Sequence, residues 1–301
     1  NWNFNFNRKI TSSRLLYLKY FPLFAKHWII LLMIIWIASY PKSGNTWLRL
    51  LISNYLWPVS SNIFDSLENI PKFPQEKYFK GIVNKEILNH NSIEAFKYFV
   101  NAQEKINENK SVKILKTHNF AGSIKGHPFT NLANTCGAIY MIRDPRSVVI
   151  SNAHHNEYDY EKSVERITSK NNVSFNDGFM EARLTWKIHY LSWKKIDVPK
   201  IIIKYEDLML EPFPVFLEVL KFINKFIKVE ISKSKIEEVI SKCSFENASN
   251  NEKKFGFIEK LGKENFFRKG LMDEWKKELK TDLVAKIEKE FEQEMRELNY
   301  L

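Results

Sequence analysis

A short run of residues near the start of the chain has the side chains that bind an anion. It reads Pro-Lys-Ser-Gly-Asn-Thr over residues 41–46. Lys42 carries a full positive charge, and Ser43, Asn45 and Thr46 have groups that can bond phosphate oxygens or cap a helix. This composition favours a loop that holds a phosphate group over an ordinary turn with a solvated lysine.

The elements on either side of this run would direct its groups into one small space. The apolar residues of 34–39 predict a strand, and apolar residues at helical spacing over 47–55 predict a helix. The turn between them contains Gly44. The N–H groups of the turn and the first unpaired N–H groups of the helix would point at a common centre, where the helix dipole adds positive charge. The order is not that of the Walker loop, because Lys42 precedes the glycine instead of following it.

Three further β-rich runs lie at 112–116, 138–142 and 200–204, and helical patterns separate them. Such alternation predicts a three-layer α/β fold, in which helices flank a central parallel sheet. Ligands bind such sheets at the carboxyl ends of the strands. We therefore expect four residues that follow the strands to meet at one edge of the sheet, namely Lys42, His118, Arg143 and Tyr205.

The run from Tyr40 to Trp47 closely resembles the 5′-phosphosulfate loop of the cytosolic-type sulfotransferases. These enzymes use 3′-phosphoadenosine-5′-phosphosulfate (PAPS) and release adenosine 3′,5′-bisphosphate (PAP). The resemblance extends from Met33 to about Lys277, and Asn45 is more typical of microbial members. It implies a P-loop-like fold, a single sulfotransferase domain over residues 33–301, and PAPS-dependent sulfuryl transfer.

The resemblance assigns most other candidate residues to the nucleotide. Arg143 and Ser151, eight residues apart, match the motif that binds the 3′-phosphate, for which a planar guanidinium is well suited. Tyr205 matches a tyrosine that contacts the nucleotide, and Trp47 and Phe245 would sandwich the adenine. The remaining matches are Ser244, beside Phe245, and the loop Arg268-Lys269-Gly270, which in the family folds over the 3′-phosphate.

The same resemblance supplies the catalytic residues. Residues 116–118 read Lys-Thr-His, similar to the family motif whose histidine deprotonates the acceptor. A free imidazole titrates near neutrality, so His118 suits removal of a proton from a hydroxyl. Lys42 would stabilise the charge that grows on the departing 5′-phosphate oxygen, and Lys116 would assist on the sulfuryl oxygens. Ser151 would hold Lys42 back until the acceptor binds.

The acceptor and the assembly state stay open at this stage. The acceptor could be a small molecule, a glycan or a lipid, with a phenol, alcohol, sugar hydroxyl, lipid headgroup or amine as the group that receives the sulfuryl. Asn119 and Phe120 depart from the Leu-Pro that often follows the family histidine, so the acceptor wall should differ. A homodimer is conceivable, but residues 276–282 do not match the usual dimer motif.

Composition narrows the class of protein only a little. A net charge of +11 suits an anion binder, but a sequence rich in Lys, Asn and Ile would be basic in any case. We expect no nucleic-acid partner. Two cysteines, Cys136 and Cys243, form no disulfide framework and indicate a reducing, cytoplasmic location. The pair His154-His155 has no third ligand at suitable spacing, so we expect no metal.

Residues 1–32 are expected to be an N-terminal extension, either non-native or upstream of the true start. The chain lacks an initiator methionine, and the first methionine is Met33. The alternative is a membrane anchor at 28–38, but that apolar run is about eleven residues and a spanning helix needs about 20. We expect no stable membrane span.

Two other functions remain for the phosphate loop. A small-molecule kinase should carry the Walker pattern and an acidic Mg²⁺ ligand, for which only Asp144 or Asp207 lies at a strand end. A nucleotide-binding protein without catalysis would not need His118, Lys42 and Ser151 together.

Several helices and one loop complete the expected structure. Residues 178–195 should form one amphipathic helix, and 247–263 a polar, mobile loop. Thr281 should cap a final helix over 281–298. Further helices are expected at 85–88, 93–106, 214–226 and 233–243.

Overall fold

The computed structural model describes residues 33–84, 93–176 and 179–301, and its centre is a parallel four-stranded sheet. The strand order is β2-β1-β5-β8. The strands are β1 (Ile34–Ser39), β2 (Lys113–Thr117), β5 (Thr135–Ile142) and β8 (Lys200–Lys204). All neighbouring strands are parallel, so the carboxyl ends of the four lie at one edge. The predicted parallel sheet is confirmed.

Continuous burial explains why β1 is apolar along almost its whole length. Every residue of β1 is buried, as expected where helices cover both faces of a parallel sheet. Ile35 and Ile37 belong to the core beneath the helix that follows β1. On the other face, the ring of Trp36 lies 5.5 Å from that of Phe73 and 5.0 Å from that of Phe129.

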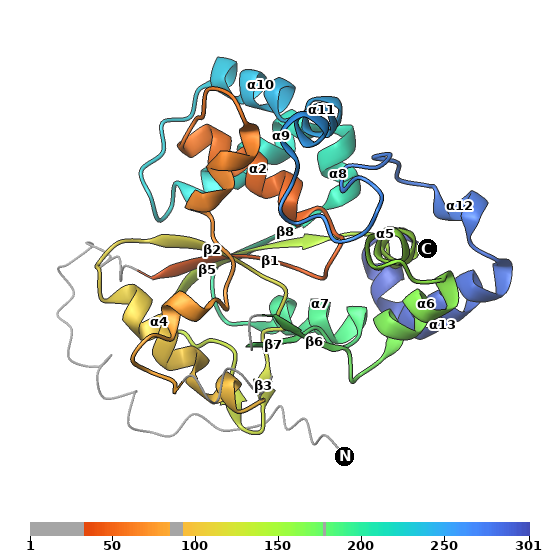
Figure 1. Ribbon diagram of the computed structural model, residues 1–301, viewed down its shortest axis with the longest axis horizontal. Coiled ribbons are helices and arrows are strands. Elements are labelled where there is room, and N and C mark those ends of the chain that lie inside the picture. The colour runs from red at the N-terminus through yellow and green to blue at the C-terminus, as the bar shows by residue number, and fades with distance from the viewer. Residues whose placement is uncertain (1–32, 85–92, 177–178) are drawn as a thin grey trace. The chain divides into compact units, whose positions relative to one another are not determined.

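Helices cover the sheet on both faces, which confirms the three-layer α/β fold (Figure 1). One face carries α2 (Asn45–Leu56), α8 (Tyr205–Leu210), α9 (Pro212–Ile223), α10 (Lys233–Lys242) and α11 (Phe245–Phe255). The other face carries α4 (Phe99–Asn107) and α7 (Trp186–Lys195). Beside the sheet, α5 (Pro145–Asn156), α6 (Tyr160–Thr168) and α13 (Thr281–Glu297) pack together.

Short elements connect these layers. They are the 3₁₀ turns η1 (Ile63–Asn69), η2 (Glu76–Tyr78) and η3 (Ile93–Tyr98), the helix α12 (Trp275–Glu278), and the strand pairs β3 (Ser123–Ile124) with β4 (His127–Pro128) and β6 (Val173–Asn176) with β7 (Phe179–Ala182). The helices predicted at 214–226 and 233–243 are present as α9 and α10, and 93–106 divides into η3 and α4. The prediction for 85–88 and those for residues 1–32 lie outside the described residues. In the part of the chain that is described, no helix has the length and apolarity needed to cross a bilayer.

The single helix predicted over 178–195 is wrong in its first part. Phe179–Ala182 is a strand, because its backbone pairs with Val173–Asn176 in an antiparallel hairpin. The helix begins only after Thr185, whose hydroxyl accepts a hydrogen bond from the Ile188 N–H at 3.0 Å and caps it. Trp186 and Trp193 on this helix are core residues.

The loop predicted over 247–263 is also wrong in its first part, since α11 extends to Phe255. Ser244 caps this helix by accepting from the Asn247 N–H, and the polar residues form its exposed face. Glu252 is buried because its carboxylate accepts from the backbone N–H groups of Phe266 and Phe267, at 2.7 and 2.9 Å. The chain is irregular between α11 and α12.

The final helix is confirmed, but not its predicted cap. Lys280 occupies the N-cap position, and Thr281 is the first helical residue. One apolar stripe of this helix faces the core, with Leu283, Ile287, Phe291 and Met295 buried and Leu298 half-buried at the end.

Candidate active site

A cavity of about 440 Å³ opens where the carboxyl ends of the strands meet. Its walls include Lys42 after β1, His118 after β2, Arg143 after β5 and Tyr205 as the first residue of α8. Residues up to 163 positions apart in the sequence therefore line one space, as the strand pattern predicted. The segments that directly follow the four strands of the sheet position these residues.

Most of the other predicted site residues line the same cavity. These are Gly44, Asn45, Thr46, Trp47, Lys116, Ser151, Phe245, Arg268, Lys269 and Gly270. Ser43 and Ser244 do not line it. Ser43 is fully buried and its hydroxyl has no hydrogen-bond partner, whereas Ser244 caps α11. Their predicted contacts with a nucleotide remain predictions.

The turn at Gly44 leaves the start of α2 free for a ligand. Gly44 has φ 90°, and a Cβ on it would lie 2.4 Å from Cδ2 of Tyr205, so only glycine fits this turn. No side chain caps α2, and its first turn carries no acidic residue. The first N–H groups of α2 and its dipole are therefore available to an anion.

Lys42 is held close to this helix terminus. Its backbone has φ 67°, and its ammonium lies 3.9 Å from the centroid of the Phe266 ring. Burial and the neighbouring charge of Arg143 lower the pKa of Lys42 to about 7. An anion beside Lys42 would offset both effects and favour the charged ammonium.

A carboxylate already contacts the loop. Glu259 accepts from Thr46 Oγ1 at 2.9 Å and from Arg49 Nη1 at 2.6 Å. Burial would raise the pKa of Glu259, but the charges of Arg49 and Lys116 outweigh it and hold the pKa well below its usual range. The ionised carboxylate therefore lies among cations that could bind an oxyanion.

Arg143 joins three parts of the site. Its Nη1 donates to the Lys42 carbonyl and its Nη2 to the Leu271 carbonyl, both at 3.2 Å. The guanidinium lies 4.4 Å over the Tyr205 ring. The Nε atom of Arg143 is buried without a partner, so the group retains hydrogen-bonding capacity.

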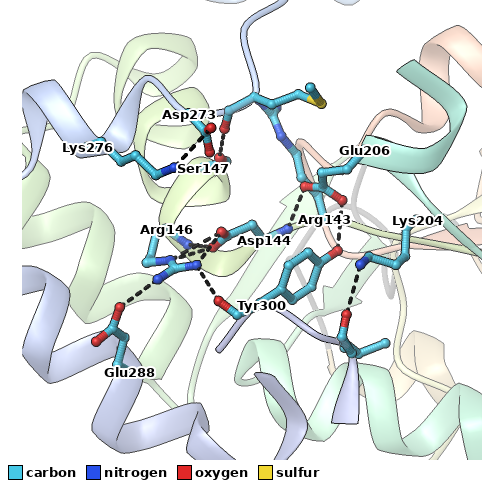
Figure 2. Close-up of polar contacts among 12 residues, drawn as sticks. Arg143, Asp144, Arg146, Ser147, Lys204, Glu206, Asp273, Lys276, Glu288 and Tyr300 are labelled. Carbon is cyan, nitrogen blue, oxygen red and sulfur yellow. Dashed lines mark hydrogen bonds and ion pairs between the residues drawn. The ribbon is translucent and has the colours of Figure 1, made fainter. Parts of the chain in front are cut away.

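A polar network fixes the strand end that carries Arg143 (Figure 2). The Asp144 N–H donates to Glu206 at 3.0 Å, and the Tyr300 hydroxyl donates to the other oxygen of Glu206 at 2.8 Å. Arg146 pairs with Asp144 at 2.8 Å and donates to the Tyr300 carbonyl at 2.8 Å. The C-terminus and α8 thus hold the end of β5 in place.

The loop before α12 closes one side of the cavity. Ser147 Oγ donates to the Met272 carbonyl at 2.6 Å and fastens this loop to α5 (Figure 2). Gly270 has φ 64°, and a Cβ there would lie 2.7 Å from the Phe245 ring. Arg268 and Lys269 line the cavity, but both form ion pairs with Glu274.

Aromatic rings give part of the cavity flat walls. Trp47 donates from Nε1 to the Cys243 carbonyl at 2.8 Å, and its ring meets that of Tyr205 edge-on, with centroids 6.2 Å apart. Phe245 lines the same cavity. Such walls suit a planar base, which can stack on aromatic side chains.

The hydrogen bond of His118 selects its tautomer. Nδ1 lies 2.8 Å from the carbonyl oxygen of Ser39, which can only accept, so Nδ1 carries the proton and Nε2 is the basic atom. Burial and the charge of Lys116 hold the pKa of His118 well below its usual range, so the ring is neutral at pH 7. Burial also lowers the pKa of the adjacent Lys116, to about 8. A neutral imidazole oriented in this way can accept a proton.

Other residues of the site were missed by sequence reasoning. They include Lys72, Asn152, His155, Glu181, Arg183 and Glu259, which line the cavity, and Arg49, which binds Glu259. Glu181 lies on β7, which was mistaken for a helix, and Lys72 lies in an irregular segment. Among the residues described, no group of three His, Cys, Asp or Glu could hold a metal. His154 instead contacts Glu264 at 3.0 Å.

Comparison with known proteins gives a consistent result. A family model described as sulfotransferase domain matches residues 34–299. A flavonol sulfotransferase-like protein of Flaveria bidentis is 27% identical over 267 residues, which cover 85% of this chain and 79% of the relative. Sulfotransferase 1E1 of Homo sapiens is 25% identical over 281 residues, which cover 87% and 83%.

Solved structures show the same fold. A mouse sulfotransferase complexed with PAP superposes with a TM-score of 0.57 at 21% identity, and the match covers 88% of this chain and 84% of that one. The three-layer arrangement of sheet and helices is therefore that of sulfotransferases of known structure.

Proposed function

The chain belongs to the sulfotransferase domain family and is a sulfotransferase, and from that premise we propose that its donor is PAPS and its base is His118. The observation that carries the proposal is the orientation of His118. Its Nδ1–H is committed to the Ser39 carbonyl, and the residue lines the same cavity as Lys42 and the uncapped start of α2. A base and an anion-binding loop in one cavity are what sulfuryl transfer to a hydroxyl requires.

Three features of the site fit a nucleotide with two anionic groups. The N–H groups of α2, with Lys42 and Thr46, would hold the 5′-phosphosulfate. Arg143 and Ser151 would hold the 3′-phosphate, and the partnerless Nε of Arg143 supports a missing anionic partner. The family resemblance also implies contacts with the nucleotide for Ser43, Ser244, Tyr205 and the loop Arg268-Lys269-Gly270. By the same resemblance, Trp47 and Phe245 would sandwich the adenine. The similar mouse sulfotransferase holds PAP.

The proposed chemistry is an in-line displacement at sulfur. The acceptor oxygen forms a bond to sulfur while the bond from sulfur to the 5′-phosphate oxygen breaks. His118 takes the acceptor proton on Nε2, and its fixed Nδ1 hydrogen bond stabilises the imidazolium that forms. Lys42 and the α2 N–H groups bind the departing oxygen more tightly as its charge grows, which lowers the barrier. Lys116 would assist on the sulfuryl oxygens, and Ser151 would restrain Lys42.

One experiment tests the donor and the reaction together. PAP should raise the unfolding temperature more than ATP with Mg²⁺ does, since binding to the folded state alone stabilises it. Incubation with PAPS labelled on sulfur and a range of hydroxylated compounds should then give labelled products. Stronger stabilisation by ATP with Mg²⁺ would instead favour a kinase.

A further inference from the structure

The part of the cavity next to His118 is lined by charged side chains. Lys72, Lys116, Glu181 and Arg183 all contribute to it. The tryptophan, tyrosine and phenylalanine rings among the described lining residues belong instead to α2, α8, α11 or the loop after α11. An acceptor that approaches His118 therefore meets charges.

Hydrogen bonds made by neighbouring backbone groups fix these charges beside the base. Lys72 pairs with Lys116 in a parallel bridge, and the Phe73 N–H donates to the Lys116 carbonyl at 2.8 Å. The end of β7 is held against the residue after His118, because the Ala182 N–H donates to Asn119 Oδ1 at 2.9 Å. Lys72, Glu181 and Arg183 thus have set positions relative to the base.

The charges in this region do not balance. Glu181 is 1% exposed and pairs with Lys72 Nζ at 3.0 Å and with Arg183 Nη2 at 2.6 Å. One carboxylate therefore faces two cations, and Lys116, whose charge also acts on Glu259, lies near them. An ammonium has three donors and a guanidinium five, so Lys72 and Arg183 retain donors after they bind Glu181. Both side chains are about one-fifth exposed, at 21% and 22%, and a ligand can reach them.

We propose that the acceptor carries an anionic group, a carboxylate or a phosphate, near the hydroxyl that receives the sulfuryl group, and that Lys72 and Arg183 bind this anion. The inference rests on the proposed function and deepens it. A planar guanidinium matches the two oxygens of a carboxylate or phosphate. An apolar acceptor would cover these charges without pairing them, which costs free energy. An ammonium group would be repelled by the excess positive charge.

A set of matched acceptors tests this proposal. Three hydroxyl scaffolds (a phenol, a benzyl alcohol and a cyclohexanol) are each prepared in neutral, carboxylate, phosphate and ammonium forms, and kcat/KM is measured with PAPS. The best anionic form should exceed the neutral form of the same scaffold by about tenfold, which corresponds to one new ionic contact. Comparison of carboxylate with phosphate identifies the anion.

Two variants test which residues bind the anion, and a third variant serves as a control. Lys72→Gln and Arg183→Gln should each reduce the preference for the anionic form to about threefold or less. Lys289→Gln removes an exposed lysine on α13 and should retain it. The preference is a ratio measured on one protein preparation, so a loss of folded protein cannot imitate its loss.

Several outcomes would overturn the proposal. They are equal or better use of neutral or ammonium forms, an unchanged preference in both variants, and no turnover of any anionic form by a protein that PAP stabilises. Turnover of neutral forms alone would leave the sulfotransferase reaction intact and reject only the anionic acceptor. Failure of PAP to stabilise the protein, together with no use of PAPS, would instead reject the proposed function and this inference with it.

Discussion

Thr46 donates a hydrogen bond from Oγ1 to the carboxylate of Glu259 at 2.9 Å, so the loop proposed to hold the phosphosulfate group already contacts a negative charge. Arg49 binds the other carboxylate oxygen at 2.6 Å. Glu259 thus makes the kind of contacts that an oxyanion of the donor would make. PAPS can bind Thr46 only if it first displaces this carboxylate.

Two residues of the loop that is expected to fold over the 3′-phosphate are in the same situation. Arg268 and Lys269 both pair with Glu274. Glu259 and Glu274 belong to the irregular segment between α11 and α12. We therefore expect donor binding to exchange these internal ion pairs for contacts with the nucleotide, and to rearrange the segment.

Removal of the Glu259 charge should tighten nucleotide binding. Glu259→Gln keeps the size of the side chain but weakens its competition with an anion, so the Kd for PAP should fall about tenfold, as for one ionic contact. The variant should also unfold at a lower temperature without PAP, because Arg49 is buried and loses its charged partner. Isothermal titration calorimetry and thermal unfolding measure the two effects.

The matched control is Glu290→Gln, which alters an exposed glutamate on α13 and should change neither quantity. Weaker binding of PAP to Glu259→Gln would show that the carboxylate helps to hold the nucleotide, contrary to this interpretation.

Replacement of His118 should separate chemistry from donor binding. His118→Ala removes the proposed base, so kcat should fall by about 10²–10⁴-fold, the usual contribution of general base catalysis. The Kd for PAP should change by less than about threefold, since the imidazole bonds to the Ser39 carbonyl and is not assigned to the nucleotide. His127→Ala, at an exposed histidine on β4, should leave both values unaltered. Full turnover by His118→Ala would exclude the residue from the reaction.

The sheet and the meeting of four residues at its edge could be predicted from the sequence. Each strand has an apolar centre and is followed by polar residues, and a parallel arrangement brings those ends together. Lys42, His118, Arg143 and Tyr205 line one cavity for that reason alone. This part of the site follows from local patterns and one topological rule.

The remaining residues depend on contacts that no local pattern encodes. Glu252 looks like a surface residue in a polar segment, but it is buried because it accepts two backbone N–H groups from residues 266 and 267. Glu181 was given a helical position because Phe179 and Ala182 are spaced like helical residues, whereas pairing with β6 makes the segment a strand. Glu259 follows the irregular turn at Gly256, and only the tertiary fold brings it to Thr46.

Addition of one methyl group at Gly270 should disturb the closing loop. Gly270→Ala places a Cβ 2.7 Å from the Phe245 ring at φ 64°, so it combines a clash with backbone strain. We expect the free energy of unfolding to fall by about 2 kcal/mol and PAP to bind more weakly. Chemical denaturation and titration calorimetry measure both.

Alanine substitutions at Gly126 and Gly256 separate the backbone strain from the clash with Phe245. Both have positive φ, 84° and 75°, but a Cβ at either would meet nothing within 4 Å. Gly126→Ala should therefore show backbone strain alone, about 1 kcal/mol. Gly256→Ala should cost more, about 1–3 kcal/mol, because Gly256 has ψ 173°, in a region that essentially only glycine adopts. A Gly270→Ala variant no worse than Gly126→Ala would mean that Phe245 moves aside at no cost.

Donor binding should weaken on the alkaline side of neutrality because of Lys42. Burial and the charge of Arg143 lower the pKa of Lys42 to about 7, so in the free protein the ammonium loses its proton as the pH rises through 7. A bound phosphate favours the charged form, and binding above pH 7 must then take up a proton. The affinity for PAP should fall by up to about tenfold per pH unit between pH 7 and 9, and level off below pH 7 where the lysine is already charged.

Lys42→Arg tests whether this lysine is the titrating group. A guanidinium stays charged throughout the range, so the dependence of the Kd on pH between 7 and 9 should flatten, whatever the absolute affinity of the variant. Lys289→Arg, at an exposed position on α13, should keep the slope of the original protein. An unchanged slope in Lys42→Arg would assign the titration to another group. Lys116 would then be tested first, because burial lowers its pKa to about 8 and it lines the same cavity.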